Sequence, residues 1–214
     1  MNQKYHGAHW GSSGYQNLKT GWLCLDFANT ADWHASEAPE EQLVSYDELL
    51  AWALDKAILD QTAVEKLRTL AHRSPAEAQQ AHVEAIELRE VLYRLFATIA
   101  AGQDPAAVDH DTLNGFLSQA LIHLQLQASD QGYQWGWRDE PVLESIPWPI
   151  VWSASRLLTS KILNRVGQCA DDRGCGWLFI DMSKNHSRRW CDMRDCGNRD
   201  KVRRYYARQR DAQA

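Results

Sequence analysis

Cysteine is the residue type whose spacing in this sequence most clearly indicates chemistry. Cys169 and Cys175 have five residues between them, and Cys191 and Cys196, which follow after fifteen more residues, have four between them. Zinc prefers four soft ligands in a tetrahedron, so two short loops that each contribute two sulfurs can hold one ion. Because four thiolates leave no coordination position for water, this spacing predicts a structural Zn²⁺ ion and not a catalytic one.

Two other uses of these cysteines are open: reduced thiols without a metal, and disulfide or redox chemistry. The first sixteen residues, MNQKYHGAHWGSSGYQ, contain no apolar run typical of an export signal. We therefore expect a cytoplasmic protein, and in a reducing compartment paired cysteines more often hold metal than form disulfides. No stretch approaches the roughly twenty apolar residues of a membrane helix, so we expect no membrane partner.

The residues around the cysteines predict turns, a short strand and a helix. Gly174, Gly176 and Gly197 stand where tight turns at the cysteines would need them. Between the pairs, residues 177–181 predict a short strand with apolar character on both faces. Residues 198–209 have the periodicity of a helix. A knuckle, a strand and a second cysteine pair leading into a helix resemble a treble-clef zinc module.

Positive charge is concentrated in the same segment. Residues 161–210 hold thirteen Lys and Arg against six Asp and Glu, a net charge of +7, which leaves ten against twenty-two, or −12, elsewhere. Only the C-terminal segment is therefore suited to meet a polyanion, and the planar fork of arginine binds two phosphate oxygens at once. The candidate nucleic-acid-binding residues are Arg188, Arg189, Arg194, Arg199, Lys201, Arg203, Arg204 and Arg208.

Arg199 has two interpretations that the sequence leaves equally open. It stands directly behind the second cysteine pair, where it could contact nucleic acid or could instead bond loop carbonyls or the carboxylates of Asp181 or Asp192. The first interpretation adds to the binding surface, and the second gives the side chain an internal role.

Residues 1–160 predict a mainly helical domain, and residues 161–214 the zinc module, so the fold class is mainly α with a few short strands. Start signals at Ser45 with Glu48, and at Ser74-Pro75 with Glu77, open two of the helices. Helical spacing predicts helices over about 45–57, 61–72, 75–102, 113–124 and 151–163. Alternation predicts strands at 23–27 and 133–137, the second with an aromatic face that we expect to pack on helices. The sequence leaves open whether the two parts are joined rigidly.

Asp26, Asn29 and Trp33 are candidate residues for a small ligand beside the end of the first predicted strand. The alternative, which we favour, is that Asp26 and Asn29 form side-chain hydrogen bonds to the nearby backbone and so cap the turn. Cys24, which stands far from the other cysteines, is most simply a buried apolar residue.

Two segments resemble parts of a known family. The stretch Trp190-Cys191-Asp192-Met193-Arg194-Asp195-Cys196-Gly197-Asn198-Arg199 is similar to the CGNR zinc finger, named for the four residues 196–199, and the similarity extends upstream to Cys169. In that family the finger follows a helical domain called ABATE. The opening strand of that domain is similar to the stretch Leu23-Cys24-Leu25-Asp26-Phe27-Ala28-Asn29-Thr30. Members are described as stress-induced transcription regulators, so the resemblance implies a DNA-binding role in a stress response.

Charge and resemblance together predict a transcription regulator that binds DNA through a structural zinc finger, with the N-terminal domain as a ligand sensor or dimerisation unit. The expected partners are a nucleic acid, for which we favour DNA over RNA, a small-molecule effector, and a second copy of the chain in a homodimer. The alternative is an RNA-binding or protein-docking zinc module without DNA specificity. An enzyme is not expected, because the sequence has no nucleophile beside a base, no paired carboxylates at catalytic spacing and no phosphate-binding loop.

Overall fold

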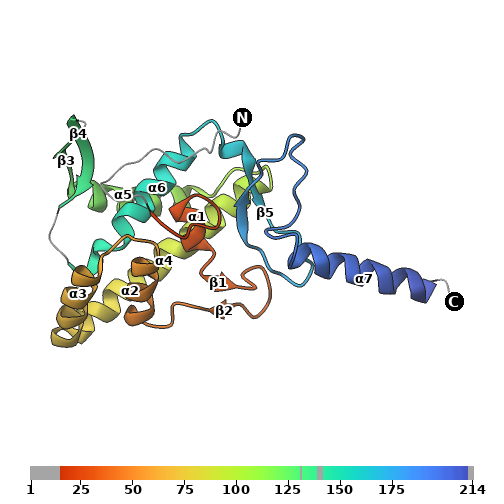
Figure 1. The fold of residues 1–214 in the computed structure, drawn as a ribbon, viewed down its shortest axis with the longest axis horizontal. Helices are drawn as coiled ribbons and strands as arrows, with labels where there is room; N and C mark the ends of the chain where they lie inside the picture. The colour runs from red at the N-terminus through yellow and green to blue at the C-terminus, as the bar shows by residue number, and fades with distance from the viewer. Residues whose placement is uncertain (1–14, 131, 139–141, 212–214) are drawn as a thin grey trace.

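The computed structural model describes residues 15–130, 132–138 and 142–211, and it shows a helical body from which one C-terminal helix projects (Figure 1). The helices are α1 (Leu23–Ala28), α2 (Tyr46–Asp55), α3 (Gln61–Arg73), α4 (Pro75–Ala100), α5 (Ala107–Leu121), α6 (Pro147–Leu158) and α7 (Cys196–Asp211), with 3-10 turns η1 (Leu143–Ser145) and η2 (Leu163–Arg165). The predicted fold class, mainly α with a few short strands, is confirmed. No helix among the described residues combines the length and the apolar character needed to cross a bilayer.

The strands of the described residues pair as short antiparallel ribbons. These are β1 (Ala31–Asp32) with β2 (Glu40–Glu41), β3 (Leu124–Ser129) with β4 (Gly132–Trp137), and β5 (Val166–Gln168) with β6 (Leu178–Ile180). In the last ribbon Val166 lies opposite Ile180 and Gln168 opposite Leu178. The β5–β6 ribbon therefore brings together the two ends of the first cysteine loop.

Local signals explain where the long helices begin and end. At the start of α3 the Asp60 carboxylate accepts a hydrogen bond from the Ala63 N–H at 2.8 Å, which satisfies one of the free N–H groups of the first turn. Pro75 occupies the first position of α4, where its fixed φ suits a helix and its missing N–H costs nothing. Just beyond the end of α4, Gly102 has φ +70°, a conformation that glycine adopts without strain.

The stretch 23–27, predicted as a strand, is a helix. Leu23, Leu25 and Phe27 alternate in sequence, but Cys24 and Asp26 between them are buried as well, and so is every residue of α1. An alternating pattern indicates a strand only when the intervening residues reach solvent, and α1 is enclosed on all sides. It lies at the centre of the body, against α4, α6 and β6.

The aromatic face predicted for 133–137 packs on helices only in part. Trp137 contacts Trp148 of α6, with ring centroids 6.1 Å apart, whereas Tyr133 is 78% exposed. The β3–β4 ribbon extends beyond the helices, so its outer end has nothing to pack against (Figure 1). Leu124, which we expected at the end of a helix, is the first residue of β3.

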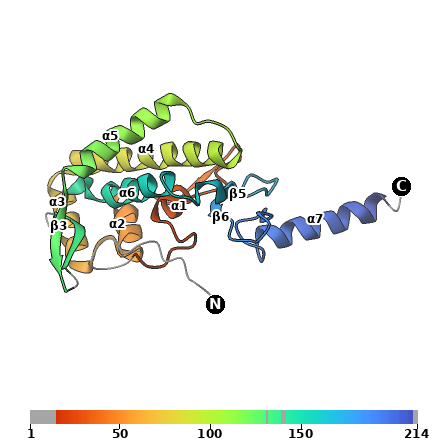
Figure 2. The ribbon, with the colours of Figure 1, turned by 90° about the horizontal axis from the view of Figure 1, so that it is seen from above.

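The β5–β6 ribbon belongs to the main hydrophobic core. Val166, Leu178 and Ile180 are buried in the same cluster as the apolar residues of α1, α4 and α6. A second, smaller cluster contains the four C-terminal cysteines, with Trp33, Trp177 and Trp190 around them. The C-terminal module is therefore attached to the body through a shared core, and α7 alone points away from it in both views (Figures 1 and 2).

This shared core predicts that replacing Leu178 by Ala destabilises the whole body. Leu178 is fully buried, and a Leu→Ala change at such a site costs about 2–5 kcal/mol in free energy of unfolding. Urea unfolding followed by tryptophan fluorescence and by far-UV circular dichroism measures the change. Val202→Ala, on the exposed surface of α7, is the control and should shift the free energy by less than about 0.5 kcal/mol. Normal unfolding of the helices in the Leu178 variant would contradict a shared core.

Candidate metal centre and nucleic-acid interface

Two loops and the start of α7 bring the four C-terminal cysteines together. Their sulfur atoms all lie within 4.8 Å of one another. Cys191 Sγ lies 3.6 Å from Cys175 Sγ and 3.6 Å from Cys196 Sγ. Cys169, Cys175 and Cys196 are buried, and Cys191 is half-buried. This cluster is the one the spacing predicted.

The dimensions of the cluster fit a tetrahedral zinc ion. Zinc–sulfur bonds of about 2.3 Å in a tetrahedron place neighbouring sulfurs about 3.8 Å apart, close to the two separations above. Four thiols this close do not ionise independently. Hydrogen bonds from Cys175 and Cys191 lower the pKa of Cys169, whereas hydrogen bonding to Cys169 and Cys175 raises the pKa of Cys191. A divalent cation offsets the repulsion among four thiolates, and as zinc it would supply a structural crosslink with no open position.

Glycine is required at two positions of the first cysteine loop. Gly174 and Gly176, on either side of Cys175, have φ +87° and +69°, which side chains other than glycine rarely adopt. A Cβ at Gly174 would lie 2.7 Å from the Ser36 backbone, and one at Gly176 would lie 2.7 Å from the Ala35 Cβ. The Ala35 N–H also donates to the Gly174 carbonyl at 3.0 Å. The loop thus turns tightly around its cysteine and presses on the segment that follows β1.

Further hydrogen bonds join this module to the body. The Asn29 side chain forms two with Leu178, accepting from its N–H at 2.7 Å and donating to its carbonyl at 2.9 Å. Trp177 Nε1 donates to the Ala31 carbonyl at 3.2 Å. These hydrogen bonds and the shared hydrophobic core connect the C-terminal module to the helical body.

Arg199 connects the parts of the metal centre to one another. Its guanidinium group donates to Asp171 of the first loop, with Nε 2.9 Å from Oδ2, and to Asp195 of the second loop. Its Nη2 also lies 2.7 Å from Cys196 Sγ. Although burial opposes ionisation of Asp171, the Arg173 N–H and the Arg199 guanidinium hold the pKa of that carboxyl below its usual range. Of the two interpretations of Arg199, the structure shows the internal one, with Asp171 and Asp195 as partners in place of Asp181 and Asp192.

Trp33 packs against the same arginine from the body. Two guanidinium groups lie near its ring, that of Arg199 at 5.1 Å and that of Arg173 at 4.8 Å from the centroid. Cation–π contacts of this kind add to the hydrogen bonds across the join. The next residue, His34, stacks on Tyr93 of α4 at 3.5 Å, and the Tyr93 hydroxyl accepts a hydrogen bond from Gln168 of β5. Sequence reasoning missed Tyr93 and Gln168, because their pairing joins segments far apart in the chain.

Two family models match the chain. The ABATE model, described as "Putative stress-induced transcription regulator", matches residues 21–161, about two thirds of the chain, and the model described as "CGNR zinc finger" matches residues 165–209. The chain belongs to the ABATE family and carries a CGNR zinc finger. No curated protein matches it. The four clustered cysteines lie within the segment that the CGNR model matches, and their arrangement fits the structural zinc ion of such a finger.

The ABATE residues predicted to bind a ligand have different surroundings. Asp26 accepts hydrogen bonds from the backbone N–H groups of Lys19 and Thr20, at 2.6 and 2.8 Å, so its carboxylate is used within the domain. Asn29 is bonded to Leu178, as described above. Asn29 and Trp33 nevertheless line a cavity of about 640 Å³ between the ABATE domain and the CGNR finger. The cap that we favoured is present for Asp26, although it closes the turn before α1 and not one after a strand.

The cationic residues of the CGNR finger divide into two groups. Those with internal partners include Arg188, which donates to the carbonyls of Ile180, Trp190 and Cys191. Arg203 pairs with Asp172 and Asp200, and Arg204 pairs with Asp200 at 2.9 Å while remaining half exposed. Among the described residues, the side chains of Arg194, Lys201, Arg208 and Arg210 have no ion-pair partner, and Arg189 lies over the Trp190 ring at 5.2 Å.

Replacing Cys196 by Ser should abolish stoichiometric zinc binding, because the site then has three thiolates and the start of α7 loses its bond to the ion. We expect zinc content, measured by atomic emission on purified protein, to fall from about one ion per chain to near zero. Limited proteolysis should then cut within residues 181–211 while β5 and β6 stay protected by the core. Cys24→Ala, at the remaining and distant cysteine, is the control and should keep its zinc. Unchanged zinc content in the Cys196 variant would show that the ligand assignment is wrong.

Arg199→Ala tests whether this side chain supports the metal centre. Loss of an outer-shell partner typically weakens metal binding about 10–100-fold, so we expect a decrease in zinc affinity of this size in competition with a chelator. Arg208→Ala removes the same charge from the far end of α7 and should leave zinc affinity unchanged. Equal affinities for the two variants would show that Arg199 is not needed for the site.

Proposed function

We propose that the protein is a transcription regulator that binds DNA through α7 of the CGNR finger, positioned by the zinc ion. The observation that carries this proposal is the exposure of α7. From Lys201 to Arg210 every residue but the half-buried Ala207 is exposed, and the helix extends away from the body (Figure 2). A helix that protrudes in this way has the dimensions to lie along a groove or a phosphate backbone.

The charge of α7 supports a polyanionic partner. Lys201, Arg208 and Arg210 of α7 have no ion-pair partner among the described residues, and neither does Arg194 in the preceding loop. When a lysine or arginine contacts a phosphate, a counterion condensed on the nucleic acid is released. This release favours binding at low salt concentration. Arg188 and Arg199 already bond within the finger, so we assign them to its structure. We assign the phosphate contacts to Arg189, Arg194, Lys201 and Arg208, with Arg204 as a half-exposed contributor.

The ABATE domain would then have the regulatory role, either by binding an effector or by pairing two chains. Its contacts with the finger offer a direct route for such an effect: Asn29 bonds Leu178 of β6, Trp33 lies against Arg173 and Arg199, and Ala35 bonds Gly174 of the first cysteine loop. A ligand that changes the position of this segment would also change the support of the metal centre. A change of this kind would alter the direction in which α7 points.

Salt-dependent binding tests the proposal with a double variant. Lys201→Gln with Arg208→Gln should weaken binding to duplex DNA and reduce the slope of log K against log salt by about 0.9 for each phosphate that the protein no longer neutralises. Fluorescence anisotropy with labelled duplexes measures both quantities. The control is Lys66→Gln with Arg73→Gln, which removes the same charge from the exposed surface of α3 and should bind as the parent does.

The same titration with single-stranded RNA separates the alternatives. Tighter binding to RNA than to duplex DNA, with the same sensitivity to Lys201 and Arg208, would favour the RNA-binding module. Absence of binding to any nucleic acid at low ionic strength would contradict the proposal and favour a protein-docking module.

A further inference from the structure

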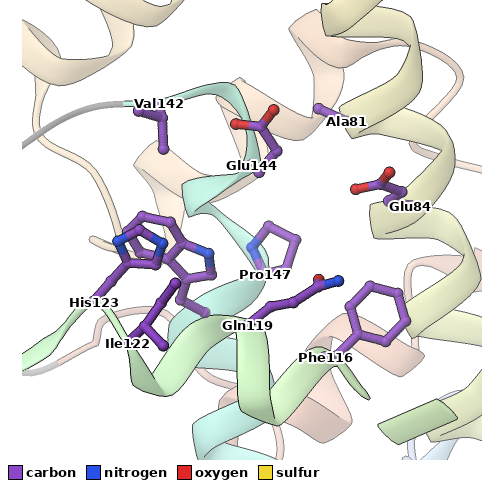
Figure 3. A pocket seen from close by; sticks show the side chains of 10 residues that line it. Ala81, Glu84, Phe116, Gln119, Ile122, His123, Val142, Glu144 and Pro147 are labelled. Atoms are coloured by element: carbon purple, nitrogen blue, oxygen red, sulfur yellow. The ribbon is translucent and has the colours of Figure 1, made fainter.

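The ABATE domain contains a second hollow, distant from the metal centre. It lies between α4, the C-terminal end of α5 and the segment from η1 into α6 (Figure 3). Its volume is about 310 Å³. Pockets for small molecules start at roughly 300 Å³, so this hollow has room for a small ligand.

The inner surface of the hollow is apolar. Ala81, Pro147 and Trp148 line it and are buried. Phe116 lines it from α5, and Ile122, which is 71% exposed, lies at its rim. Contact with an apolar group of a ligand would bury the exposed Ile122 side chain, and burial of apolar surface is favourable.

One face of the Trp148 ring is already fixed by a neighbour. His123 stacks on it with ring centroids 3.8 Å apart and an interplanar angle of 8°. Trp137 of β4 contacts the same indole at 6.1 Å. His123 also lines the hollow, so the stacked pair forms one aromatic wall whose indole is held by His123 and Trp137 without a ligand.

The charged side chains of the hollow are both acidic. Glu84 projects from α4 and Glu144 from η1, and Figure 3 shows both carboxylates in the upper part of the view, above Pro147. Among the described residues, no lysine or arginine lines the hollow. Gln80 donates a hydrogen bond to Glu84 at 2.8 Å, but neither glutamate has an ion-pair partner in the described part of the chain.

We propose that this hollow binds a small organic cation, an ammonium group attached to an apolar or aromatic tail. The tail would occupy the space beside Phe116 and Trp148, and the ammonium group would lie between the carboxylates of Glu84 and Glu144. Ring faces also attract cations, so the walls and the carboxylates favour the same charge. An anion would meet two uncompensated negative charges in a domain that is itself strongly acidic.

This site is independent of the finger and does not require the protein to bind DNA. It deepens the regulatory role proposed above only by giving the ABATE domain a ligand class. Binding of a cation to the hollow and binding of nucleic acid to α7 can each be measured without the other, so the failure of one leaves the other standing.

The test uses three matched probes with the full zinc-loaded chain. These are 2-phenylethylamine, the neutral 2-phenylethanol and the anionic phenylacetate, each titrated by ligand-observed NMR. We expect saturable binding of the amine, with a dissociation constant on the order of 1 mM or lower. The alcohol should bind roughly tenfold more weakly, since it keeps the apolar contact and loses the charge. The anion should not bind measurably.

The double variant Glu84→Gln with Glu144→Gln should reduce amine affinity roughly tenfold and leave the alcohol unaffected. The control, Glu77→Gln with Glu87→Gln, removes two exposed carboxylates of α4 outside the hollow and should bind the amine as the parent does. Circular dichroism establishes that each variant is folded. Absence of amine binding, equal binding of the alcohol, or full amine affinity in the Glu84/Glu144 variant would each overturn the proposal.

Discussion

Convergence of four sulfur atoms on one point is the constraint on which the C-terminal module of this molecule depends. Cys169 and Cys175 come from a loop attached to the body, whereas Cys191 and Cys196 come from a loop with few apolar side chains and from the start of α7. A bound cation removes the repulsion among these thiolates and so fixes one loop against the other. Arg199 adds a second connection across the same gap, through Asp171 and Asp195.

The sharing of one hydrophobic core determines which part of the finger can depend on the metal. Leu178 and Ile180 of β6 are buried against the helices, so hydrophobic burial holds this ribbon whether or not zinc is bound. Beyond Asp181 the chain leaves the core, and the position of α7 depends on the ion and on Arg199. The metal therefore acts as a crosslink between a fixed ribbon and a protruding helix. The ABATE segment around Trp33 contacts both.

Patterns that reflect purely local physics were readable from the sequence. The Ser74-Pro75 helix start and the periodicity of α3 and α4 each depend on neighbours in the chain, and each matches the structure. The cysteine cluster joins two separate pairs, but each pair is close in sequence and only one residue type is involved, so its spacing was also informative. The strand predicted at 23–27 failed because its alternation was produced by a helix buried on every side, a tertiary effect. The sequence did not decide whether Arg199 bonds within the finger or contacts nucleic acid, because its partner Asp171 lies 28 residues away. Pairings such as Asn29 with Leu178, 149 residues apart, had no signal in a single sequence.

The most direct test of the role of the metal is nucleic-acid binding by the same preparation before and after zinc removal. The metal is extracted with a chelator, binding of a labelled duplex is measured by anisotropy at low ionic strength, and zinc is then restored. We predict tight binding with zinc, a large decrease without it, and recovery when the ion is returned, while the helical signal of the body stays constant. Equal binding in the presence and absence of zinc would contradict the claim that the ion positions α7 for its partner.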